Sequence, residues 1–132
     1  MDQAEIINSI VESLLEEPAL VDDPHWDSFA LVASVTPEVA DMSAYRYAGA
    51  GLGQPTPVRN TSLGLFRDLR AETLGPNDQP WDVCIVKIDR DTARGSVNFV
   101  YGEEEAAIWR INPANPRQLA ENLRPQPADF MA

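Results

Sequence analysis

The spacing of apolar residues along the chain predicts three helices. Residues 2–17 carry isoleucine, valine and leucine at helical intervals, which would form one apolar stripe until Pro18 interrupts backbone hydrogen bonding. Residues 63–74 carry a second stripe and follow a polar segment that suits a helix cap. Residues 117–123 follow a proline-containing start signal and would form a short last helix.

Two hairpins separate these helices. Residues 26–35 are rich in aromatic and β-branched residues, and residues 39–47 would form the returning strand after a proline-containing turn. Residues 81–89 and 96–101 form the clearer pair, because apolar residues recur at every second position. The side chains expected to share a face are Trp81, Val83 and Ile85 on one strand and Val97, Phe99 and Tyr101 on the other.

The order of these elements predicts the fold class. Consecutive hairpins favour an antiparallel sheet of four to five strands, with an N-terminal, a middle and a C-terminal helix packed on it, the α+β class. A further short strand is expected at residues 106–111, a loop at residues 49–57 and a loose tail at residues 124–132. The length suits a single domain over residues 1–132.

Charge limits the partners that the chain can bind. Lys and Arg number 10 against 21 Asp and Glu, a formal net charge of −11. A field of that sign repels phosphate backbones and anionic membranes, so neither nucleic acid nor a membrane is expected as a partner. The excess of acid either serves solubility alone or steers the chain toward a basic protein. The first residues are acidic, whereas a secretory signal begins with basic residues. This difference favours the cytoplasm as the location.

Residues for catalysis or metal binding are few. Cys84 is the only cysteine and lies in an apolar run, which favours a buried side chain over a nucleophile. His25 is the only histidine, and the aspartates near it do not complete the ligand set of a zinc or calcium site. We therefore expect no catalytic residue, no metal and no cofactor, and the chain is expected not to be an enzyme.

The acidic run after the second hairpin is the candidate partner-binding surface. Glu103, Glu104 and Glu105 would project from the edge of the sheet, with Tyr101 and Trp109 as aromatic anchors for a basic protein. The alternative is that the glutamates only protect the sheet edge from aggregation. Trp109 would then belong to the core.

Three segments resemble the YezG-like immunity-protein family, the antitoxins of bacterial polymorphic toxin systems. They are the amphipathic helix over residues 6–15, the helix over residues 63–74 with the following Trp81-Asp82-Val83-Cys84-Ile85-Val86, and the hairpin strand ending Gly95-Ser96-Val97-Asn98-Phe99-Val100-Tyr101. The resemblance implies a non-enzymatic protein that binds and blocks a cognate toxin, often a nuclease. A small ligand-binding or enzymatic domain and a homodimeric structural subunit remain the alternatives.

Overall fold

The computed structural model describes residues 2–36, 40–75, 78–109 and 116–130. They form a five-stranded antiparallel sheet in the order β3-β2-β1-β4-β5. The strands are β1 (Ser28–Val35), β2 (Ala40–Tyr47), β3 (Gln54–Pro55), β4 (Val83–Asp89) and β5 (Arg94–Val100). The prediction of an α+β fold on an antiparallel sheet is confirmed. Position 39, where the returning strand was expected to begin, lies outside the described residues.

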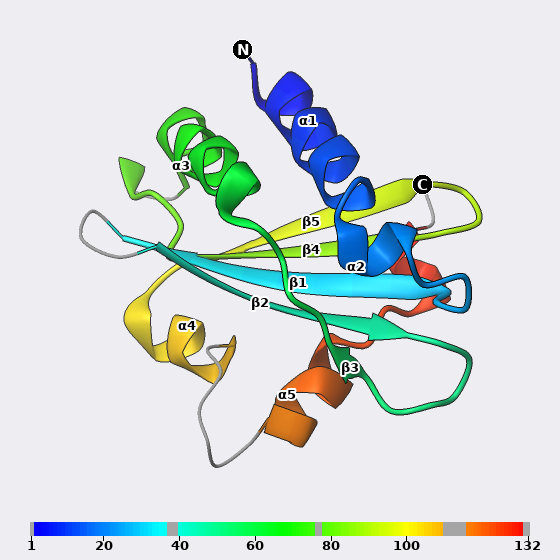
Figure 1. Cartoon of the computed structure of the whole chain (residues 1–132). Coiled ribbons are helices and arrows are strands. Elements are labelled where there is room, and N and C mark those ends of the chain that lie inside the picture. The colour runs from blue at the N-terminus through cyan, green and yellow to red at the C-terminus, as the bar shows by residue number, and fades with distance from the viewer. Residues whose placement is uncertain (1, 37–39, 76–77, 110–115, 131–132) are drawn as a thin grey trace.

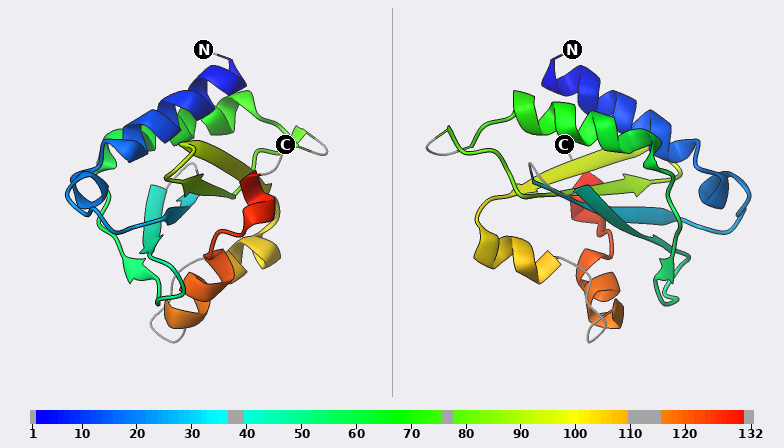
Figure 2. Two further views of the ribbon diagram at one scale, coloured as in Figure 1. Left: turned by 90° about the vertical axis from the view of Figure 1, so that its right-hand side faces the viewer. Right: turned by 60° about the vertical axis from the view of Figure 1, so that its left-hand side comes forward.

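Helices cover both faces of the sheet (Figures 1 and 2). α1 (Gln3–Leu15) and α3 (Leu63–Glu72) lie on one face, and α4 (Glu103–Trp109) and α5 (Pro116–Leu123) lie on the other. Short helical turns whose bounds are described are α2 (Pro18–Val21), η1 (Asn60–Ser62) and η3 (Pro127–Phe130). The central strands are therefore buried on both sides, which explains why β1 and β4 read as nearly continuous apolar runs.

The two faces of β4 contribute to two separate cores. The predicted facing of the second hairpin is confirmed for Trp81, which stacks on Phe99, and is wrong for Val83 and Ile85. Cys84 and Val86 pack in the core beneath α1 and α3, whereas Val83 and Ile85 belong to the core on the α4 and α5 side. The side chains of Val97 and Phe99 pack against the first of these cores, because Val97 pairs with Val86 and Phe99 with Cys84. A shift of one residue in register exchanges the faces, and a strand buried on both sides carries no polar positions to reveal it.

The segment after β5 is a helix, whereas a short strand was expected at residues 106–111. α4 begins directly after Gly102, whose φ of 89° turns the chain away from the sheet. The amide of Gly102 donates to Asp82 Oδ2 at 3.1 Å, and its carbonyl accepts from the amide of Ala106. The three glutamates thus form the first turn of a helix, where negative charge is favourable. Positions 110 and 111 lie outside the described residues.

Residues 49–57 and the C-terminal segment are both attached to the sheet. Gln54 and Pro55 form β3 on β2, and Arg124 donates to the carbonyl oxygens of Gly49 and Gly51 at 3.3 and 2.6 Å. Residues 124–132 were expected to form a loose tail. Instead, η3 packs at the start of β5, where the guanidinium of Arg94 donates to the carbonyl of residue 130 at 3.1 Å.

Candidate protein-interaction site

The outer side of β5 is an open sheet edge. Within the described residues, β5 pairs with β4 alone, and it is the last strand of the sheet. The opposite edge differs, because β2 is followed there by the two-residue β3 with Pro55, and proline limits further pairing. β5 contains no proline, and Arg94 at its start is its only charged residue. An edge of this kind is a template for another strand.

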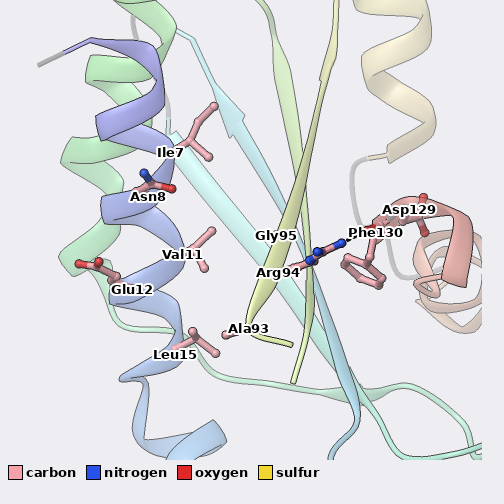
Figure 3. Close-up of a pocket in the computed structure, with 10 residues that line it drawn as sticks. All are labelled: Ile7, Asn8, Val11, Glu12, Leu15, Ala93, Arg94, Gly95, Asp129 and Phe130. Atoms are coloured by element: carbon pink, nitrogen blue, oxygen red, sulfur yellow. Dashed lines mark hydrogen bonds between the residues drawn. The ribbon is translucent and has the colours of Figure 1, made fainter. Parts of the chain in front are cut away.

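A hollow of about 580 Å³ lies across the start of this edge (Figure 3). α1 supplies one wall, the turn between β4 and β5 supplies the floor, and η3 supplies the other wall. The side chains that matter below are Val11, Glu12, Arg94, Asp129 and Phe130. α1 covers one face of the sheet and contacts Gly95. η3 lies on the opposite face, where it contacts Lys87 and Arg94. The hollow therefore extends over both sides of β5.

The wall formed by α1 follows from the helical repeat. Ile7, Val11 and Leu15 recur every four residues and are half-buried beside the fully buried stripe of the same helix. Gly95 lets this row approach β5, because a Cβ at that position would lie 2.7 Å from Cγ2 of Val11. Leucine, isoleucine and valine side chains thus give the hollow an apolar wall.

The opposite wall is fixed by polar contacts. The Nζ atom of Lys87 lies 3.4 Å from Asp129 Oδ2, and both side chains are largely buried. Arg94 donates to the carbonyl oxygen of Phe130. The turn before Arg94 is set by Asp89, whose Oδ2 accepts from the amide and hydroxyl of Thr92 at 3.2 and 2.7 Å. η3 is therefore held against β4 and β5 from two directions.

Two charges at the hollow, one of each sign, have no ion-pair partner among the described residues. Glu12 is exposed on α1 and has no ion-pair partner among the residues that the structure describes. Asp129 is compensated by Lys87. Arg94 is exposed and bonds to a carbonyl oxygen, so no described carboxylate neutralises it. The α1 side of the rim is thus acidic, and the β5 side carries the positive charge of Arg94.

The residues predicted from sequence as a partner-binding surface lie beyond the other end of β5. Glu104 and Glu105 are exposed on the first turn of α4. The two aromatic residues are not brought together: Tyr101 packs against the core under α1 and α3, and Trp109 packs against the core on the other face. The ring of Tyr101 occupies the space where a Cβ on Gly75 would stand.

Sequence reasoning did not find the hollow beside Val11. Its walls come from residues more than 100 positions apart in the chain, and no local pattern joins α1 to η3. Two signals were present nonetheless. The apolar stripe of the first helix is wide enough for a second row, and the strand at residues 94–100 lacks the prolines that guard an edge.

Cys84 and His25 do not form a nucleophile–base pair. Cys84 is fully buried, as expected from its apolar run, and burial raises the pKa of its thiol. Cys84 pairs with Ala33 in β1. His25 is exposed and precedes Ser28, the first residue of β1, so five strand residues separate Ser28 from the position of Cys84. Five strand residues span roughly 17 Å. Among the described residues, no group of three or more His, Cys, Asp and Glu could hold a metal ion.

A second, smaller hollow of about 320 Å³ lies between α5 and β3. Tyr45, Arg117 and Glu121 contribute to its lining. The hydroxyl of Tyr45 is buried and has no hydrogen-bond partner in the described part of the chain, and burial raises its pKa. An unpaired buried hydroxyl beside a hollow is a feature of sites that bind polar groups.

In comparisons with known proteins, no family model matches the chain and no curated protein matches it significantly. Among the residues described, no helix combines the length and apolar character that crossing a bilayer requires.

Proposed function

We propose that this chain is a non-enzymatic binding protein of the immunity type, which neutralises a basic toxin domain by covering its substrate-binding surface. The observation that carries the proposal is the open edge of β5, flanked by α1 and η3, in a chain of net charge −11. Edge strands bind other proteins through their backbone, and an acidic protein is attracted to a surface built to bind phosphates.

The acidic turn of α4 supports the same proposal through the rate of association. Glu104 and Glu105 are exposed and lie just beyond the end of β5. Charges on the rim of an interface accelerate encounter with a partner of opposite sign, and they add little to affinity once the complex has formed. In this proposal Glu104 and Glu105 therefore act as steering charges, and the edge of β5 supplies the contacts.

The test of this function is co-expression with the product of any neighbouring open reading frame that is toxic when expressed alone. We expect the chain to restore growth and to co-purify with that product. Toxicity that persists at full expression of the folded chain, together with the absence of a complex, would contradict the proposal. Enzymatic turnover of the partner by the chain would also contradict it.

A charge-matched pair of variants separates steering from net charge. Glu104→Lys with Glu105→Lys is expected to slow association at low salt by at least about fivefold. Asp68→Lys with Glu72→Lys makes the same change in net charge on α3, on the other face of the sheet. Equal rates for the two double variants would remove the role given to the α4 glutamates.

Binding of a small molecule at the Tyr45 hollow is a second candidate function, favoured by the unpaired hydroxyl. If no ligand uses that hydroxyl, Tyr45→Phe is expected to leave stability unchanged or raise it by about 1 kcal/mol. A ligand that raises the thermal midpoint of the parent, but not that of Tyr45→Phe, would establish this function in place of the first.

A further inference from the structure

We infer that the open edge of β5 accepts an extended, basic segment of the partner, which adds to the sheet as a further strand. The inference rests on the proposed function and names the part of the surface that performs it. The segment would lie between α1 and η3, place an apolar side chain in the hollow and set basic side chains against the acidic rim at Glu12.

The backbone of β5 provides the first argument. In an edge strand, alternate residues turn their N–H and C=O groups away from the sheet, where a further strand can bind them. β5 runs over seven residues, Arg94–Val100, without a proline. Seven residues span roughly 23 Å, enough for a register-specific strand pair. The edge at β3, by contrast, is two residues long and contains Pro55.

The hollow provides the second argument, because it gives an added strand a place for its side chains. Gly95, Val97 and Phe99 lie on the α1 face of β5, so side chains of an added strand on that face would meet Val11 and the apolar wall of α1. On the other face, the strand would meet Phe130 of η3. Both walls limit the directions from which a segment can approach.

Charge decides between the candidate occupants. A second copy of this chain would bring −11 against −11, so edge-to-edge pairing of two copies is opposed by repulsion. A basic segment is attracted by the same charge. The exposed carboxylate of Glu12 has no ion-pair partner among the described residues and adds to this attraction from the outer side of α1, where it points away from β5 (Figure 3). The basic side chains of the segment would have to lie away from Arg94, which carries a positive charge at the start of β5.

The probe for the test is the synthetic peptide acetyl-Lys-Val-Lys-Val-Lys-Val-Lys-amide, added to the whole chain. Hydrogen exchange and amide chemical shifts locate its binding site. We expect slower exchange at residues 94–100. Two further peptides carry N-methyl groups on alternate residues, one in each register. Binding should be at least tenfold weaker for the one whose methyl groups face β5, and little changed for the other. N-methylation leaves charge and side chains unchanged. In one register it removes the donors that pair with β5, and in the other it removes donors that face solvent, so the second peptide is the control.

A variant of the chain tests the acidic rim. Glu12→Lys is expected to weaken peptide binding at least fivefold, and Glu72→Lys, the same charge change on exposed α3, is expected to have less than half that effect on the logarithmic scale. Hydrogen exchange of each variant without peptide is the control for the fold, and the pattern of the parent chain is expected.

Four results would overturn the inference. They are equal binding of the unmodified peptide and both N-methylated peptides, protection centred on a surface other than β5, absence of binding at about 1 mM peptide, and protection of β5 by self-association of the chain alone. The last result would assign the edge to a second copy. None of them bears on rescue of growth in co-expression, so the proposed function can stand or fail separately.

Discussion

Gly95 lies directly against Val11, so closely that a Cβ on residue 95 would stand 2.7 Å from Cγ2 of Val11. The contact joins the first helix to the start of the edge strand. Val11 cannot easily turn aside, because a β-branched side chain in a helix has one strongly preferred rotamer. The spacing between α1 and β5, and with it the width of the hollow, therefore depends on the missing side chain at position 95.

Gly95→Ala is expected to destabilise the chain by about 1–3 kcal/mol, the usual cost of overpacking. Alanine in place of a strand glycine is otherwise favourable, so the sign of the change tests the contact. Urea unfolding measures it, and Val11→Ala in the same chain should recover most of the loss. Gly64→Ala is the control, because nothing lies within 4 Å of the added Cβ. A stabilising Gly95→Ala would contradict the close packing.

Arg124 attaches the loop after β2 to α5, and Arg124→Lys should release it. The lysine cannot reproduce the contacts of the guanidinium with the carbonyl oxygens of Gly49 and Gly51, nor its position 4.9 Å from the centre of the Tyr47 ring. We expect amides near Gly51 to exchange about tenfold faster. Arg117→Lys, within α5, should leave them unchanged. Unaltered exchange in Arg124→Lys would mean that the loop is held by other contacts.

Asp23 should contribute to the pH dependence of stability. The backbone N–H of His25, and then Arg46 at 2.8 Å, hold the pKa of Asp23 below its ordinary value of 3.8. A carboxyl with a lowered folded-state pKa stabilises the fold fully above the unfolded-state value, and this stabilisation is lost as the pH falls through the folded-state pKa. Asp23→Asn should therefore lose less stability than the parent below pH 3.8.

Urea unfolding at several pH values measures that difference. Asp91→Asn serves as the control, because the Asp91 carboxylate accepts no hydrogen bond from the described residues. The control should retain the acid-induced loss of the parent. If Asp23→Asn follows the parent curve as well, the contacts with His25 and Arg46 contribute nothing in solution.

Cys84 should not react in the folded chain. Its side chain is fully buried between α1 and the sheet, and burial raises the pKa of the thiol, so little thiolate forms near neutral pH. Labelling with iodoacetamide should proceed only at the rate of unfolding and should become fast in urea. Rapid labelling of the native chain would show an accessible thiolate and would restore the nucleophile as a hypothesis.

The fold class was predictable because its strongest signals are local. The helical repeat in residues 2–17 and the turn between the strands of the second hairpin depend on neighbours within a few positions. The facing of that hairpin was not predictable, since Val83 and Cys84 are apolar neighbours buried on opposite faces. α4 was missed because Gly102 and the glutamates indicate the end of a strand and the first turn of a helix equally well.

The candidate site was less predictable than the fold. The sequence drew attention to Glu103, Glu104 and Glu105 because charge is visible in it. The hollow beside Val11 depends on where η3 docks, and that depends on contacts such as Lys87 with Asp129. Contacts between residues 42 positions apart leave no periodic trace in one sequence. Contact of the partner with the β5 edge, and steering by the α4 glutamates, both stay predictions.

Hydrogen exchange on the complex formed by co-expression tests the central claim most directly. The account predicts that amides of residues 94–100 are the most strongly protected by the partner, with a smaller effect at the start of α4. Protection confined to the face of α3, or to the hollow lined by Tyr45, with β5 exchanging as in the free chain, would contradict it.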